Sequence, residues 1–375
     1  MKPQIALVKC PDYKSELVTA SVMRAASLLG GAESFIRPGA RVLIKPNMLA
    51  GKAPDKAVTT HPEVVRAAVR LVKSAGGVPV IGDSNAIGSF KKVAEVTGIA
   101  DVAAEEGASL IELTDTVKVQ GKGVFKHFEV AREVMAADSV INLPKAKTHG
   151  QMLLTLAVKN LFGCIPGRRK AQWHFKAGVD RDAFATMLVE LHGIVKPALN
   201  IVDAVVGMEG NGPGNGTPRD MGFIAAGTDA ISLDMALSEI LGVPADRLPT
   251  TRAARKLGLT PGGISDIELL GDFTGIYEAR VPGFKLPSTS SVEWTIPEPM
   301  RKLLKEALTT KPKVDKLKCQ VCLMCKTACP ADAISEGSDG LSINYRQCIR
   351  CFCCQEVCPV GAIEVAEGWL LKYLG

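Results

Sequence analysis

Cysteine residues gather near the C-terminal end of this 375-residue sequence. Eight of the eleven fall in two runs with one spacing, C-x2-C-x2-C-x3-C, and each run is followed directly by a proline. The first run is Cys319, Cys322, Cys325 and Cys329, and the second is Cys348, Cys351, Cys354 and Cys358. Thiolates are soft metal ligands, whereas a hydrophobic core has no need for cysteine at this density. The repeated spacing therefore indicates metal centres held by thiolates.

This spacing resembles the cysteine runs of bacterial ferredoxins that carry two [4Fe–4S] clusters. In that pattern three closely spaced thiolates hold one cluster, and the fourth cysteine of the run ligates the other cluster. The resemblance implies two sites, which we call cluster 1 (Cys319, Cys322, Cys325 and Cys358) and cluster 2 (Cys329, Cys348, Cys351 and Cys354). Such crossing needs a pseudo-twofold module, and "ADAISE" after the first run matches "VGAIEV" after the second. We expect a small α+β ferredoxin-like domain over residues 315–367.

Two other uses of these cysteines are open alternatives. Zinc sites use two or four cysteines in C-x2-C pairs, typically with a longer spacer between the pairs. Disulfides are the second alternative, although a reducing compartment does not favour them. A further cysteine, Cys353, is out of step with the second run. We predict that it packs near a cluster without acting as a ligand.

Charge is spread unevenly along the chain, whose formal net charge is +6. Residues 315–367 contain five Lys/Arg and seven Asp/Glu, so their charge is −2 and that of the remainder is +8. Attraction between the two parts favours docking of the cysteine module on the rest of the chain. The basic excess suits an anionic small molecule, since no Lys/Arg run or RNA-binding aromatic motif points to nucleic acid.

The sequence lacks the features of a secretory signal or a membrane span. The first apolar run is short and is followed by Pro11 and Asp12, which differs from a signal peptide. No stretch approaches the roughly 18 apolar residues of a membrane helix. A cytoplasmic protein is therefore expected.

Strand-like and helix-like segments alternate over the first ~270 residues, which predicts a layered α/β domain with a mostly parallel sheet. Apolar runs predict strands over 5–10, 41–47, 78–84, 138–144, 199–207 and 221–229. Helical spacing of apolar residues predicts helices over 15–29, 61–77, 181–195 and 230–241. The helix at 61–77 has Pro in its first turn and Gly at its end, as helix termini prefer.

The chain is predicted to have four parts. These are the α/β domain (1–271), a linker or strap (272–314), the cysteine module (315–367) and an apolar tail (368–375). The linker is rich in Pro and Ser over 281–299, and an amphipathic helix is predicted over 297–310. We expect the tail to pack on the large domain or on a second subunit, which would make a homodimer.

Several basic residues lie at predicted strand ends or in the adjoining loops. In an open α/β sheet, ligands bind outside the carboxyl ends of the strands. Lysines there would hold a carboxylate or phosphate, and histidine would transfer protons or bind metal. We predict a catalytic role for Lys45, Lys145, Lys147, His149 and Lys159, and loop positions for His61 and His174. "LPKAKTH" is expected to be a turn after a buried strand. The alternative is that each lysine is a solvated surface charge.

A glycine-rich segment, "MEGNGPGNGTP" (208–218), is the second candidate for ligand binding. Gly210, Gly212 and Gly214 would let the backbone approach a cofactor closely and cradle a phosphate with N–H groups. The segment lacks the P-loop Lys-Ser/Thr pair and the dinucleotide fingerprint in its strand–turn–helix context. A structural turn is the alternative.

Other candidates carry weaker signals. Five acidic residues near predicted strand ends would serve as general bases or metal ligands: Asp83, Asp203, Glu209, Asp229 and Asp234. For Asp234, which lies inside a predicted helix, a role as a helix cap is the alternative. Cys164 lies between two glycines, in "GCIPG". We interpret it as a small buried residue, and a nucleophile is the alternative.

Four motifs in the large domain resemble the DUF362 family, over about residues 36–245. They are "VLIKPNM" (42–48), "TTHPEVVRAAV" (59–69), "INLPKAKTHGQMLLTLAVKNLFGCIPG" (141–167) and "DAVVGMEGNGPGNGTPR" (203–219). Many members of that family are fused to ferredoxin modules of this kind. The resemblance implies an iron–sulfur protein of redox type without a known substrate.

Three functions fit these features. The first is an oxidoreductase, or a component of one, in which the clusters pass single electrons to or from an anionic substrate or cofactor in the α/β domain. The second is a non-catalytic electron carrier or docking protein that serves a redox partner. The third is a non-redox enzyme with structural or regulatory clusters. Binding of an additional organic cofactor is a further alternative, although the sequence has no flavin fingerprint.

Overall fold

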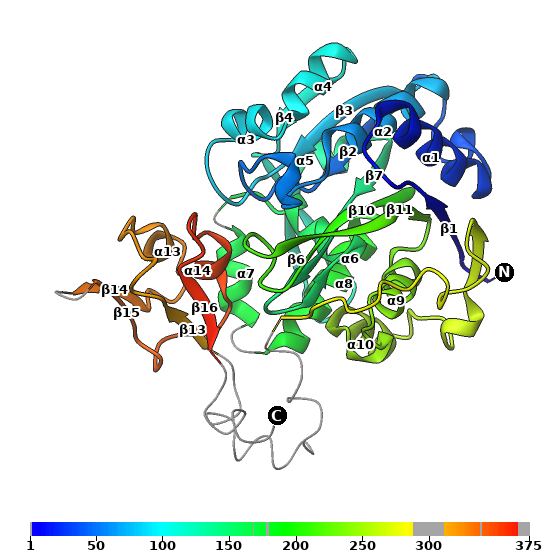
Figure 1. Ribbon diagram of the computed structural model, residues 1–375. Coiled ribbons are helices and arrows are strands. Elements are labelled where there is room, and N and C mark those ends of the chain that lie inside the picture. The colour runs from blue at the N-terminus through cyan, green and yellow to red at the C-terminus, as the bar shows by residue number, and fades with distance from the viewer. Residues whose placement is uncertain (1, 168, 178–179, 288–310, 338–339, 367–375) are drawn as a thin grey trace.

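A computed structural model describes residues 2–167, 169–177, 180–287, 311–337 and 340–366 (Figure 1). An α/β domain forms the larger part, and a small module with its own short sheets lies beside it. Both the α/β class and the ferredoxin-like C-terminal region are as predicted. Among the described residues, no helix is long and apolar enough to cross a membrane.

One large sheet organises the α/β domain. Its strand order is β12 (Glu268–Gly271), β1 (Gln4–Lys9), β11 (Thr217–Gly227), β10 (Leu199–Glu209), β7 (Ser139–Leu143), β2 (Arg41–Pro46), β3 (Val78–Asp83) and β4 (Ser109–Glu112). β8 (Lys145–His149) also pairs with β10, and β9 (Leu153–Thr155) pairs with β8. Most pairings are parallel, but β11 is antiparallel to both of its neighbours and β9 is antiparallel to β8.

Helices cover both faces of this sheet. One face carries α1 (Ser15–Leu28), α2 (Pro62–Ser74), α3 (Phe90–Val96) and α4 (Ile99–Glu105). The other carries α5 (Arg132–Ala136), α6 (Ala157–Asn160), α7 (Arg169–Ala177), α8 (Arg181–Val195), α9 (Ala230–Ile240) and α10 (Pro249–Lys256). Successive side chains of a strand point to opposite faces. In β1, Ile5 and Leu7 therefore join one core while Ala6 and Val8 join the other, which explains the unbroken apolar run in the sequence.

Local sequence signals account for the predicted helices. The side chain of His61, at the N-cap of α2, accepts a hydrogen bond from the Glu63 backbone N–H. Pro62 fills the first helical position, where its missing N–H costs nothing. The hairpin of β5 (Thr116–Gln120) with β6 (His127–Ala131) was not predicted, although TVKVQ and HFEVA each alternate polar and apolar residues.

The cysteine module is built from two similar halves. β13 (Lys311–Val314) pairs with β16 (Ile363–Ala366), and β14 (Ile334–Gly337) pairs with β15 (Gly340–Ile343). Two single-turn helices, α13 (Met324–Thr327) and α14 (Cys353–Glu356), each follow the first cysteines of a run. Because β13 pairs with β16, residues 311–314 belong to this module and not to the predicted linker.

The linker is described only in part. Residues 272–287 lie on the α/β domain, where Phe273, Ile276, Phe284 and Leu286 pack against its core. This first part of the linker is thus a strap on the large domain. The predicted helix at 297–310 and the apolar tail at 368–375 lie outside the described residues.

Candidate functional site between the two domains

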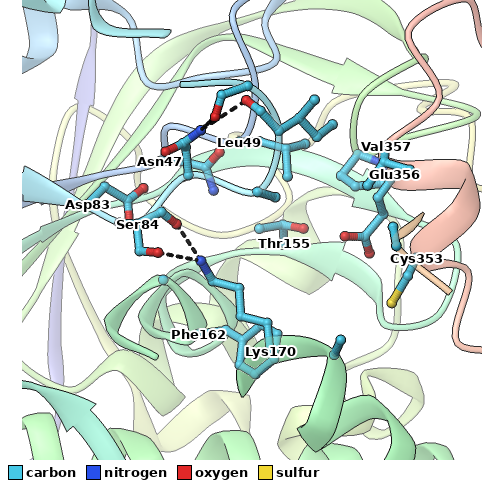
Figure 2. Close-up of a pocket in the computed structure, with 18 of the residues that line it drawn as sticks. Asn47, Leu49, Asp83, Ser84, Thr155, Phe162, Lys170, Cys353, Glu356 and Val357 are labelled. Atoms are coloured by element: carbon cyan, nitrogen blue, oxygen red, sulfur yellow. Dashed lines mark hydrogen bonds between the residues drawn. The ribbon is translucent and has the colours of Figure 1, made fainter. Parts of the chain in front are cut away.

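A cavity of about 550 Å³ lies between the α/β domain and the cysteine module. The α/β domain lines it with residues that follow β2 and β3 and with parts of β8, β9, α6 and α7. The module lines it with residues of α13 and α14 and with Cys322. Figure 2 shows Glu356 and Cys353 of α14 on one side, Asp83 and Ser84 on the other, and Thr155 between them. Both domains therefore complete one site.

Lys45, at the end of β2, lies on the cavity wall in a buried ion pair. Its ammonium is 2.9 Å from Oδ1 of Asp83 and donates a hydrogen bond to the Pro46 carbonyl at 3.0 Å. The Asp83 carboxylate also accepts hydrogen bonds from the backbone N–H groups of Met48 and Ser84. The pair therefore fixes the carboxyl ends of β2 and β3 against each other.

Lys147, on β8, has only neutral partners among the described residues. Its ammonium donates to Asn47 Oδ1 at 3.0 Å and to the Val58 carbonyl at 2.5 Å. Burial of the ammonium lowers the pKa of Lys147 to about 7. This lysine is thus poised to be charged or neutral near physiological pH.

The free energy of unfolding should depend on pH because Lys147 is buried. The folded protein releases its proton near pH 7, whereas the unfolded chain keeps it up to about pH 10.4. Between these values the unfolded chain binds more protons, so this residue makes stability rise with pH by up to about 1.4 kcal/mol per pH unit. Lys147→Met is expected to flatten the rise between about pH 7.5 and 9, measured by guanidinium unfolding. Parallel curves for both proteins would contradict this expectation.

Lys159, on α6, presents its ammonium to the cavity. The ammonium lies 4.9 Å from the ring centroid of Phe162 and 5.8 Å from that of Phe184. It has no hydrogen bond or ion pair with any residue that the structure describes, and burial lowers its pKa. The helix is anchored by Asp234, whose carboxylate accepts from the Ala157 and Val158 N–H groups at 2.7 and 3.0 Å. Asp234 is therefore a helix cap.

His149, at the end of β8, connects the α/β domain to the module. Its Nδ1 accepts hydrogen bonds from the backbone N–H groups of Gln151 and Met152 at 3.1 and 3.2 Å. Its Nε2 is 2.9 Å from Oε1 of Glu356 on α14. Because Nδ1 accepts these two hydrogen bonds it carries no proton, so we assign a neutral ring with its proton on Nε2, facing the carboxylate. Burial also lowers the pKa of His149.

Lys145 does not line the cavity. Its ammonium is 2.8 Å from Asp203 Oδ2 and 2.7 Å from the Tyr13 hydroxyl. The Tyr13 ring stacks on His61 with ring centroids 3.5 Å apart. The structure thus brings together Lys45, Lys147, His149 and Lys159 and separates Lys145 from them. Residues 145–149 also form a buried strand, β8, and not the predicted turn.

Two residues of α7 that the sequence interpretation did not place in the site also line the cavity. Lys170 donates to the Ser84 carbonyl at 2.5 Å and to its hydroxyl at 2.9 Å, and burial lowers the pKa of Lys170 to about 8. Burial also lowers the pKa of His174 to about 3. His174 lies in this helix and not in the predicted loop. A spacing of four residues, which puts both side chains on one face of a helix, is the signal that could have found them.

The glycine-rich segment connects β10 to β11 and contacts the module. The Gly210 N–H donates to the Lys285 carbonyl, and the Gly212 N–H donates to the Thr148 hydroxyl. From the same loop, Asn215 donates to the Cys358 carbonyl at 3.4 Å, and Asn211 accepts from Gln355. Cofactor binding by Gly210, Gly212 and Gly214 stays a prediction, while these contacts make the loop part of the interface with the module.

The cysteine runs adopt a backbone suited to an anionic cluster. Val321 and Leu323 have positive φ angles of 49° and 59°, and Arg350 and Phe352, at the equivalent positions of the second run, have 54° and 60°. Such angles are rare for non-glycine residues, above all for β-branched valine. Backbones that include left-handed residues turn successive N–H groups into a concave anion site, as at many Fe–S clusters.

The hydrogen bonds to cysteine sulfur and the grouping of the cysteines also fit two sites of four thiolates each. The Ala333 N–H donates to Cys329 Sγ at 3.2 Å, and the Ala362 N–H donates to Cys358 Sγ at 3.1 Å, at equivalent places in the two halves. Hydrogen bonds to sulfur are typical of cluster ligands. A small cavity is lined by the four cysteines of the proposed cluster 2: Cys329, Cys348, Cys351 and Cys354.

The remaining thiols of the runs surround Cys325. Burial raises the pKa of Cys325, and the neighbouring thiols Cys358, Cys322 and Cys319 raise it further. Among the described residues, no three Cys, His, Asp or Glu side chains are placed for a single metal ion. Cys353 lies beside Cys351 and lines the large cavity.

Cys164 is fully buried next to the Lys45 and Asp83 pair. Burial raises the pKa of its thiol to about 12. A thiol that resists deprotonation is a poor nucleophile, so this geometry favours the interpretation as a small core residue.

Comparison with known proteins identifies both parts of the chain. Residues 42–239, more than half of the chain, match the family described as Domain of unknown function (DUF362). The chain belongs to the DUF362 family. Residues 311–359 match a 4Fe-4S dicluster domain, so this DUF362 protein carries the predicted fusion, and the dicluster domain supports an iron–sulfur electron-carrier role.

One curated relative covers most of this DUF362 protein. It is the Thylakoid-associated protein sll1697 of Synechocystis sp. (strain PCC 6803), 38% identical over 306 residues, which are 81% of this chain and 94% of that protein. Among solved structures, the lactate racemase apoprotein from Thermoanaerobacterium thermosaccharolyticum aligns with a TM-score of 0.39 and 11% identity, over 60% of this chain and 54% of that one. That structural similarity is too low to support an argument about function.

Proposed function

We propose that this protein passes single electrons between two [4Fe–4S] clusters in its module and a small anionic molecule in the interdomain cavity. The observation that carries the proposal is the lining of that cavity. Cys322, a ligand of cluster 1 in our assignment, lines it together with Lys159 and His149 of the α/β domain. A molecule bound there would contact both the cluster module and the basic residues of the large domain.

The clusters, when bound, would supply one-electron chemistry. The chain's own residues bind and enclose the substrate. The Lys159 ammonium offers charge to an anion, while the Lys45–Asp83 pair provides a fixed wall at the end of the sheet. The His149–Glu356 contact holds α14 against β8, which closes the cavity on the module side and limits access of water.

A redox partner protein would exchange electrons with the clusters from outside. An open groove of about 800 Å³ between α7 and the module is lined by Gln172, Phe175, Cys329 and Pro330. Phe175 is 56% exposed there, and Cys329 is a ligand of cluster 2 in our assignment. The same groove supports the second candidate, a non-catalytic carrier that exchanges electrons only with proteins.

An anaerobic experiment separates the two candidates. Small molecules that co-purify with the full-length protein are released and identified by mass spectrometry. The molecule is then added to dithionite-reduced, desalted protein, and the EPR signal of the reduced clusters is followed. We expect stoichiometric loss of the signal in the wild type and a much slower loss in Lys159→Met with unchanged iron content. A signal that persists although the molecule binds would favour the carrier.

A further inference from the structure

Apart from His149 Nε2 and Glu356 Oε1, which face each other at 2.9 Å, two buried polar atoms in the interdomain cavity lack hydrogen-bond partners among the described residues. They are Oγ1 of Thr155 on β9 and Nδ1 of His174 on α7, and both side chains are more than nine-tenths buried. Buried polar groups in native proteins are nearly always paired, so unpaired ones in a cavity point to a ligand. Figure 2 shows Thr155 in the middle of the cavity, between the α/β wall and α14.

The cations around the cavity differ in what they can offer to a ligand. Lys45 is paired with Asp83, and Lys147 and Lys170 donate to neutral oxygen atoms at hydrogen-bond distance. Within the described part of the chain, Lys159 alone among these lysines has an ammonium without such a partner. One charged donor, Lys159, and one hydroxyl, Thr155, are thus available together.

This pair of donors suits a carboxylate better than a phosphate. A carboxylate has one negative charge and two oxygen atoms, which one ammonium and one hydroxyl can satisfy. A phosphate monoester carries nearly two charges and three acceptor oxygens at pH 7. The glycine loop does not supply the missing donors, since the N–H groups of Gly210 and Gly212 bond to other parts of the protein.

The module side of the cavity has an apolar part beside a paired carboxylate. Met324, Ala328 and Val357 form the apolar part, while Glu356 faces His149 at 2.9 Å. Leu49 and Ile87 extend the apolar surface on the α/β side. A cavity of about 550 Å³ lies in the range of sites for cofactor-sized or drug-sized ligands. The ligand therefore has an apolar body that faces the cluster module and an anionic end that faces α6.

We infer that the cavity binds a conjugated monocarboxylate, with its carboxylate on Lys159 and Thr155 and its flat apolar body against Met324 and Val357. The conjugated character rests on the proposed function, because an extended π system can accept or release a single electron. The carboxylate end rests on the cavity alone. Binding and electron transfer can therefore fail separately.

Binding of matched probes to the full-length, cluster-loaded protein tests the inference by anaerobic calorimetry. The probes are 2-naphthoate, its neutral isostere 2-naphthamide, 2-naphthyl phosphate and acetate. We expect 2-naphthoate to bind about 10- to 100-fold more tightly than 2-naphthamide, which is the range for a charge-assisted hydrogen bond. Acetate, without an apolar body, should show no measurable binding. Equal affinity for naphthoate and naphthamide, or tighter binding of the phosphate, overturns the assignment.

Two variants, with a third as control, locate the carboxylate. Lys159→Met should weaken 2-naphthoate binding about 10- to 100-fold and leave 2-naphthamide unaffected, whereas Lys170→Met removes the same charge from a lysine already engaged by Ser84 and should cost about threefold or less. Thr155→Val keeps the side-chain shape and removes an unpaired hydroxyl, so it should fold at least as well and lose about 3- to 10-fold in affinity. Equal losses in Lys159→Met and Lys170→Met would mean that general charge, and not a defined site, attracts the anion.

The proposed function fails independently of this inference. If 2-naphthoate binds as expected but no co-purifying molecule oxidises or reduces the clusters, the electron-transfer proposal is wrong and the carboxylate site stands. If the clusters exchange electrons with a phosphate in the cavity, the function stands and the carboxylate class is wrong.

Discussion

Asp203→Ala is expected to destabilise the α/β domain by about 3–5 kcal/mol, the usual cost of leaving one partner of a buried ion pair alone. The Asp203 side chain is fully buried and accepts hydrogen bonds from Lys145, Tyr13 and the His61 backbone N–H at 2.7–2.9 Å. Without the carboxylate, the Lys145 ammonium would stay buried without a negative charge. The network also joins the middle of β10 to the start of α2, so its loss affects two elements.

Guanidinium unfolding followed by tryptophan fluorescence measures this effect in the anaerobic, cluster-loaded protein. Asp55→Ala is the matched control, since Asp55 pairs with Lys56 at 2.9 Å but both side chains are more than half exposed. Exposed pairs contribute about 0–1 kcal/mol. A double variant, Lys145→Met with Asp203→Leu, should recover most of the loss because it leaves no unpaired buried charge. A cost for Asp203→Ala no larger than that for Asp55→Ala would show that the pair is not buried in solution.

Substitution of single cysteines is expected to remove one cluster at a time, in pairs that cross between the two runs. The wild-type protein should bind about eight iron atoms and give low-potential EPR signals on reduction. Cys329→Ala and Cys351→Ala lie in different runs but should lose the same cluster, with about half of the iron remaining. Cys322→Ala and Cys358→Ala should lose the other one. Iron analysis and EPR after anaerobic purification measure both properties.

Cys353→Ala is the control for this series. It removes a thiol two residues after Cys351, at the start of α14, and should retain all of the iron because Cys353 lies outside the ligand spacing. Loss of a different cluster in Cys329→Ala than in Cys351→Ala would refute the crossed assignment. Two zinc ions per chain and no iron would refute the clusters altogether.

The sequence by itself determined the cysteine module and most of the large sheet. The ligand spacing lies within 12 residues in each run, so local sequence reports it directly. These strands are apolar on both faces because helices cover both sides of the sheet, and this makes β1, β2 and β3 visible as short apolar runs and β7 as one interrupted only by Asn142. The capped start of α2 is likewise a local signal.

Only the tertiary structure decided which basic residues share a site. Lys145 and Lys147 are two residues apart on β8, yet one is paired with Asp203 and the other lies on the cavity wall. Their partners, Asp203 and Asn47, are 58 and 100 residues away in sequence. The site is completed by Lys170, His174 and Glu356, which come from a helix and a module with no local link to β8. Long-range packing sets the desolvation and pairing of each charge, and for that reason the sequence could name the lysines but not their roles.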